Sequence, residues 1–200
     1  MSKNSYIQKS VTIKKGKIYI DRKGVFENDD KNLHAFLKDA YTRFELNYPK
    51  FHKMDGLSKL GILAATLLFD GRKINKETAL VFSNSASSLE VDREHQKAMA
   101  KIVSPSVFVY TLPNIVLGEI SIKYRLKSEN IFFVVPRFDA SLLSEYVHIL
   151  MNTGKSSEVV CGWIDLENGE YDVFLSLISR EGNVLFSEEN LEKLYLFENE

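Results

Sequence analysis

The sequence predicts an α/β domain built on a mixed, mostly parallel β-sheet that is flanked by helices. Segments with short apolar runs alternate along the chain with segments whose apolar residues recur at helical spacing. The run 131–135 is continuously apolar and ends at Pro136, a pattern typical of a parallel strand buried on both faces. With 200 residues, the chain is long enough to bury a sizeable core in one such domain.

Two helices are predicted in the first part of the chain. The first lies between Asn32 and Leu46 and is closed by Pro49, because the residue before a proline avoids helical backbone angles. The second, 54–69, has Asp55 as its N-cap and is apolar around most of its circumference, so it must be buried on more than one side. Strands are also predicted at 17–20 and 79–82, a polar loop at 26–32, and helices at 89–102 and 112–126, the last opened by Pro113.

The strand 131–135 is followed by a helix that Asp139 caps and Gly154 ends. Its apolar residues form one stripe, and its other side is predicted to face solvent. That outer face carries Ser141, Ser144, Glu145, His148 and Asn152. Further strands are predicted at 159–164 and 173–178, the second forming a hairpin through 180–183 with 184–186, and a short helix at 188–197.

Composition excludes several classes of protein. Lysine plus arginine number 26 and aspartate plus glutamate 27, which gives no electrostatic case for nucleic-acid binding. The longest apolar run, 61–69, is too short for a membrane span, and the N-terminus does not resemble a signal peptide. A single cysteine, Cys161, excludes an intramolecular disulfide and zinc sites that need two thiolates. We therefore expect a cytoplasmic protein that binds no membrane.

Charge is unevenly distributed along the chain. Residues 1–25 carry a net charge of +6, and residues 165–200 carry a net charge of −8. Either two solvated faces of the molecule differ in charge, or the basic end receives an acidic partner.

No familiar catalytic or phosphate-binding motif occurs: GxxxxGK[ST], GxGxxG, GxSxG and HExxH are all absent. The four histidines, His34, His52, His95 and His148, are not spaced as metal ligands, so no metal or cofactor site is predicted. Cys161 lies in an apolar strand, where burial raises a thiol's pKa and the side chain packs as a small hydrophobe. The serine-rich segment 83–88 is either a turn that caps the next helix or the rim of a pocket.

Several segments, taken in order, resemble the N-terminal half of β-ketoacyl synthases, the condensing enzymes of the thiolase fold. These segments are 51–60 with Ala64 and Ala65, 79–88, 104–108, 112–114, 118–122 and 156–163. The resemblance covers 51–179; 1–50 is only vaguely similar, and 180–200 is predicted to be a C-terminal hairpin and helix. It implies half of a thiolase-like fold, organised as one domain over 1–200, in a half-length member of the family.

The departures from the family decide what the resemblance implies about activity. The family places a nucleophilic cysteine where a strand like 131–135 meets the central helix, and that position falls at about Arg137, which cannot accept an acyl group. The family's other catalytic residues lie in a C-terminal half that has no counterpart in these 200 residues. No catalytic residue is therefore predicted, and the candidate pocket residues are Arg137, Asp139, Asn114 and Ser85. The polar outer face of the helix after Asp139 favours a stand-alone half fold.

The resemblance implies a non-catalytic β-ketoacyl-synthase-like accessory protein of fatty acid, polyketide or aryl-polyene-type biosynthesis. It would pair with a synthase or an acyl carrier protein, as a homodimer or heterodimer through strand 131–135. One alternative is an acyltransferase or 3-oxoacyl synthase subunit whose active site another chain completes, with Cys161 as its one thiol. The other is an anion-binding module that uses Arg137 near a helix N-terminus.

Overall fold

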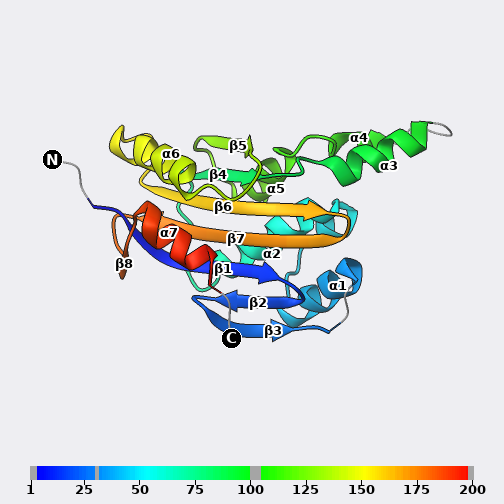
Figure 1. Cartoon of the computed structure of the whole chain (residues 1–200), viewed down its shortest axis with the longest axis horizontal. Coiled ribbons are helices and arrows are strands. Elements are labelled where there is room, and N and C mark those ends of the chain that lie inside the picture. The colour runs from blue at the N-terminus through cyan, green and yellow to red at the C-terminus, as the bar shows by residue number, and fades with distance from the viewer. Residues whose placement is uncertain (1–3, 30–31, 100–104, 198–200) are drawn as a thin grey trace.

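The computed structural model describes residues 4–29, 32–99 and 105–197 and contains one mixed eight-stranded sheet (Figure 1). The strands are β1 (Tyr6–Lys14), β2 (Lys17–Ile20), β3 (Lys23–Glu27), β4 (Thr78–Asn84), β5 (Asn130–Val134), β6 (Glu158–Glu167), β7 (Glu170–Ser179) and β8 (Val184–Leu185). Their order is β3-β2-β1-β7-β6-β4-β5, and β8 pairs with β1. β1, β3, β4, β5 and β6 run in one direction and β2, β7 and β8 in the other, which confirms the predicted mixed sheet. Five of the seven pairings among these strands are antiparallel, and two, β4–β5 and β4–β6, are parallel.

Helices cover both faces of the sheet (Figure 1). The helices are α1 (Leu33–Arg43), the 3-10 turn η1 (Pro49–Lys53), α2 (Gly56–Phe69), α3 (Leu89–Met99), α4 (Pro105–Val109), α5 (Ile115–Tyr124), α6 (Ala140–Asn152) and α7 (Glu188–Tyr195). One apolar core lies between the sheet and α1, α2 and α5, and a second lies between the sheet and α6 and α7. The fold therefore has three layers, with the sheet in the middle.

α2 is the buried helix that its sequence predicts. The Asp55 side chain caps it by accepting hydrogen bonds from the Leu57 and Ser58 amides, at 3.1 and 3.2 Å. Nearly the whole helix is buried, and it passes so close to α5 that a Cβ at Gly61 would overlap the Val116 side chain. Because α2 packs against β1, β6 and β7 as well as α5, its apolar circumference is explained.

Two strand predictions are wrong. The run 131–135 was expected to be buried on both faces, but β5 is the edge of the sheet, only half-buried, with Val134 55% exposed. The predicted hairpin through 180–183 does not form, because β8 pairs with β1 instead of β7. The hairpin is β6–β7, and it turns at Asn168 and Gly169, which both have left-handed backbone angles.

Smaller differences concern element boundaries. β1 was not predicted, and Phe26 and Glu27 belong to β3 instead of a loop. The helix expected at 112–126 spans only Ile115–Tyr124, with the separate helix α4 before it. Residues 100–102, which complete the expected helix 89–102, lie outside the described part of the chain.

Candidate functional site

The segment between β5 and α6 contains the position where the resemblance places a nucleophile. Asp139 caps α6, its Oδ1 accepting a hydrogen bond of 2.9 Å from the Leu142 amide. Arg137 lies two residues before this cap and is exposed, and its side chain forms no hydrogen bond or ion pair with the described residues. The helix entrance thus presents a cation to solvent where acyl transfer would need a nucleophile.

Aromatic side chains pack beneath this entrance. The Phe138 ring stacks on Tyr195 of α7 at a centroid distance of 3.9 Å, and it meets Trp163 and Phe174 edge-on. Trp163 and Phe174 are buried. This aromatic packing joins the N-terminus of α6, the end of α7 and the sheet into one unit.

The serine-rich turn after β4 is held by a carboxylate from β6. The Ser85 hydroxyl donates to Asp165 Oδ2 at 2.7 Å, and the Ser85 and Ala86 amides donate to Asp165 Oδ1 at 3.0 and 3.1 Å. Ser85 therefore belongs to a hydrogen-bonded polar cluster, but its partner Asp165 was not predicted. An aspartate directly after the apolar run 159–164 was the available signal.

A second carboxylate lies beside Asp165. Asp172 of β7 accepts a hydrogen bond of 2.6 Å from the Tyr195 hydroxyl, while its other oxygen, Oδ1, is buried with no hydrogen-bond partner among the described residues. Burial raises the pKa of the Asp172 carboxyl, and the negative charge of Asp165 adds to that rise. Burial and the hydrogen bond to Asp172 both raise the pKa of Tyr195 as well, so its hydroxyl stays a donor.

A hollow of about 1510 Å³ opens next to Asp172, and residues from both ends of the chain line it. Its cations are Lys14, Lys15 and Lys17, and its anions are Glu27, Asp29, Asp165, Glu167, Glu170 and Asp172. Lys14 lies opposite Asp172 in the β1–β7 pair. Part of the basic N-terminal segment therefore lies alongside part of the acidic C-terminal segment.

The remaining candidates lie apart from these groups. Cys161 is fully buried in β6, and burial strongly raises the pKa of its thiol, as predicted. Asn114 is exposed before α5, and its side chain does not cap that helix. No group of three or more metal-ligating side chains occurs among residues 4–29, 32–99 and 105–197.

The outer face of α6 only partly matches its prediction. Ser141, Glu145 and Asn152 are exposed as expected. Ser144 is buried and donates a hydrogen bond to the Ser141 carbonyl oxygen at 3.0 Å, and His148 is half-buried against the Phe186 ring. Phe186, between β8 and α7, covers His148, so polar character alone did not predict the exposure of this position.

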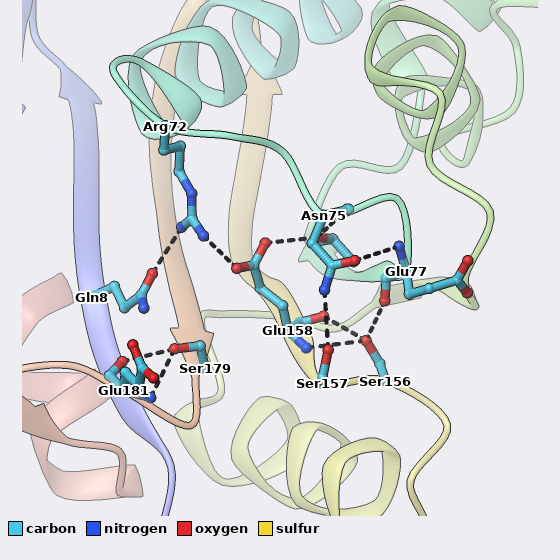
Figure 2. Close-up of polar contacts among 10 residues, drawn as sticks. Gln8, Arg72, Asn75, Glu77, Ser156, Ser157, Glu158, Ser179 and Glu181 are labelled. Carbon is cyan, nitrogen blue, oxygen red and sulfur yellow. Dashed lines mark hydrogen bonds and ion pairs between the residues drawn. The ribbon is translucent and has the colours of Figure 1, made fainter.

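A further polar network, which was not predicted, lies at the opposite end of β6 (Figure 2). Arg72 Nη2 pairs with Glu158 Oε2 at 2.5 Å, and the Thr78 hydroxyl donates to Glu158 Oε1 at 2.7 Å. Arg72 also donates to Gln8 of β1 at 2.8 Å. The network lies at the amino ends of β4 and β6, whereas ligand sites of open α/β sheets lie beyond the carboxyl ends of the strands.

No helix in the described ranges is both long enough and apolar enough to cross a lipid bilayer.

No protein-family model matches the chain, and no curated protein matches it. Several solved structures do. The ishigamide ketosynthase/chain length factor has a TM-score of 0.63 at 16% identity, over 88% of this chain and 62% of that chain. A ketosynthase in complex with its chain length factor, from Xenorhabdus doucetiae, has a TM-score of 0.59 at 12% identity, over 90% and 80% of the two chains.

A third match is a type II PKS acyl-carrier protein in complex with its ketosynthase, with a TM-score of 0.62 at 14% identity, over 89% of this chain and 63% of that chain. The chain thus spans less than two thirds of the length of two of these three proteins. At such low identities the similarity establishes the fold alone. That fold is the thiolase-like fold of ketosynthases, which the resemblance to β-ketoacyl synthases implied.

Proposed function

We propose that this protein is a non-catalytic, ketosynthase-like partner protein of fatty acid, polyketide or aryl-polyene-type biosynthesis. The observation that carries the proposal is Arg137, an exposed guanidinium at the entrance of α6. The resemblance to β-ketoacyl synthases places the nucleophile of thioester condensation at this helix entrance, and an arginine side chain cannot form an acyl intermediate. The one thiol of the chain, Cys161, is fully buried.

The solved structures with the same fold support a partner role. Two of them are described as pairs of a ketosynthase with a chain length factor, and a third contains an acyl-carrier protein bound to its ketosynthase. By analogy, we infer that this chain pairs with a ketosynthase or with an acyl carrier protein.

The free edge of β5 is the surface that we assign to pairing. Its hydrogen bonds to β4 are bracketed by the Glu129 carbonyl, which accepts from Leu80, and by the Val135 amide, which donates to Asn84. Alternation in a parallel ladder then directs the backbone polar groups of Phe132 and Val134 away from β4. Unpaired strand edges are templates for a strand from another chain.

Affinity capture of the tagged protein from its native cells, followed by mass spectrometry, tests the partner role. Recovery of a ketosynthase or an acyl carrier protein in stoichiometric amounts is the expected result. Recovery of the protein alone overturns the proposal.

Intact-mass analysis after incubation with an acyl thioester tests the absence of catalysis. We expect no adduct that hydroxylamine releases, because a thioester-linked acyl group needs an accessible thiolate. A hydroxylamine-labile adduct that disappears in Cys161→Ala would favour an acyltransferase subunit instead.

The unpartnered Arg137 side chain also supports a second candidate function, an anion-binding module. Phosphate titration monitored by NMR tests it. Saturable chemical-shift changes of residues around Arg137 that are lost in Arg137→Ala would favour the anion-binding function. Unchanged spectra would exclude it.

A further inference from the structure

The turn between β6 and β7 contains the one asparagine–glycine pair of the sequence, Asn168–Gly169. Both residues are exposed and have left-handed backbone angles, with φ of 53° and 78°, as the two central residues of a type I′ turn do. Because glycine has no side chain, it leaves its own backbone nitrogen unshielded. An asparagine before glycine is therefore the asparagine that most readily cyclises onto the following nitrogen and loses ammonia.

Two residues of α3 contact this pair. Glu90 Oε1 accepts a hydrogen bond of 2.7 Å from the Gly169 amide, and Arg93 Nη1 donates one of 3.0 Å to Asn168 Oδ1. Positions three apart lie on the same face of a helix, so one face of α3 packs on the turn. The Gly169 nitrogen and the Asn168 side-chain carbonyl group are also the two groups that cyclisation joins.

The cyclisation is the first step of deamidation. The Gly169 nitrogen attacks Asn168 Cγ, a C–N bond forms, and the bond from Cγ to Nδ2 breaks. The side-chain nitrogen leaves as ammonia, together with the proton that the Gly169 nitrogen loses. Water then opens the succinimide ring at one of its two carbonyl groups, which gives aspartate or isoaspartate.

The Glu90 contact opposes cyclisation in two ways. The attacking nitrogen has to lose its proton, and the negative charge of an adjacent carboxylate disfavours the amide anion that results. The cyclic product has no hydrogen on the Gly169 nitrogen, so its formation also removes the hydrogen bond to Glu90. A carboxylate is too weak a base to take the amide proton itself. The net effect of Glu90 is therefore to slow the reaction.

We propose that Asn168 is a deamidation site and that Glu90 protects it while α3 packs on the turn. Isoaspartate would lengthen the backbone of a two-residue turn by one carbon, although the flanking residues Glu167 and Glu170 are paired in the β6–β7 ladder. The modification would thus strain the hairpin that lies between β1 and β4 in the sheet.

The test is the deamidation rate of Asn168 in the full chain at physiological temperature and pH. Peptide mass spectrometry with chromatographic separation measures its asparagine, aspartate and isoaspartate forms. Glu90→Ala should deamidate about fivefold faster than the wild type, the factor expected when a hydrogen bond to a charged group on the surface is lost. An unchanged or slower rate in Glu90→Ala overturns the proposal.

Two further variants complete the comparison. Glu94→Ala is the matched control, because it removes an exposed carboxylate from the same helix that forms no hydrogen bond with Asn168 or Gly169. It should deamidate at the wild-type rate. Glu90→Gln keeps the shape of the side chain and loses its charge, so it should accelerate deamidation by a smaller factor than Glu90→Ala. A Glu94→Ala rate as high as that of Glu90→Ala overturns the proposal.

The unfolded chain separates the effect of the contact from that of the sequence. In guanidinium chloride at a concentration that unfolds the protein, the contact between Glu90 and Gly169 is lost. The wild type and Glu90→Ala should then deamidate at the same rate, which should exceed that of the folded wild type. A wild-type chain that deamidates no faster when unfolded overturns the proposal, as does a fivefold difference between the two chains that persists in the denaturant.

Discussion

Asp165 of β6 and Asp172 of β7 lie directly opposite each other in an antiparallel pair, and each carboxylate holds a different element. Asp165 accepts three hydrogen bonds from the turn at Ser85 and Ala86, and Asp172 accepts the hydroxyl of Tyr195 in α7. The pair connects one end of the sheet to the turn after β4 and to the last helix.

Asp172→Asn is expected to stabilise the protein at neutral pH. The pKa of Asp172 is raised, chiefly by burial, so the folded state binds more protons than the unfolded state between the ordinary value of about 3.9 and the raised value. The free energy of unfolding of the wild type therefore falls as pH rises through that window. Urea denaturation at pH 7 and at pH 3.5 checks this. Relative to the wild type, the variant should have a higher free energy of unfolding at pH 7 but not at pH 3.5. An equal gain at both pH values would contradict the raised pKa of Asp172 as its cause.

Gly162→Ala is expected to cost about 3 kcal/mol or more of unfolding free energy. A Cβ at this position in β6 would overlap the Phe174 carbonyl oxygen of β7, and a backbone carbonyl within a sheet cannot move aside. Gly118→Ala in α5 is the matched control, because a Cβ there meets nothing within 4 Å. It should stabilise by about 0.5–1 kcal/mol. Thermal and urea unfolding of both variants measure the contrast.

Val134→Pro is expected to abolish pairing through β5 without unfolding the chain. Its side chain is 55% exposed and its amide points away from β4, so proline removes an outward donor and no hydrogen bond within the sheet. Val134→Thr keeps the amide and a β-branched side chain. Native mass spectrometry of the captured complexes should show a complex for the threonine variant and none for the proline variant; persistence of both would place the interface elsewhere.

Glu158→Ala is expected to cost about 3–5 kcal/mol, because it leaves the partly buried Arg72 guanidinium without its ionic partner. Arg72→Met strands the buried Glu158 carboxylate in the same way. Since both changes break one interaction, the double variant Arg72→Met/Glu158→Ala should lose clearly less than the sum of the single losses. A double-mutant cycle by urea denaturation measures this coupling, and strict additivity would show that the two groups do not interact.

Elements whose signals are local could be predicted from the sequence. α2 and α6 follow from their apolar periodicity and from the N-caps Asp55 and Asp139, and β2 from its short apolar run. β1 was missed because its register shifts between Ile7 and Lys9, which interrupts the alternation along the strand.

Features that depend on distant neighbours could not be predicted. The apolar run of β5 has the same sequence pattern whether its second edge pairs with a strand of its own sheet or with a strand of another chain. The predicted pocket residue Ser85 does belong to a polar arrangement, but its partner Asp165 is 80 residues away. The Arg72–Glu158 pair spans 86 residues, and no periodicity within either segment records it.

The place of the β6–β7 hairpin in the sheet constrains how the chain folds during synthesis. The hairpin lies between β1 and β4, which therefore never pair with each other. The strands β1–β3 and the parallel pair β4–β5 cannot join into one sheet until residues 158–179 have left the ribosome and paired with both. Such non-local pairing slows folding and leaves strand edges exposed in the meantime, so the nascent chain depends on residues 158–179 to become a single sheet.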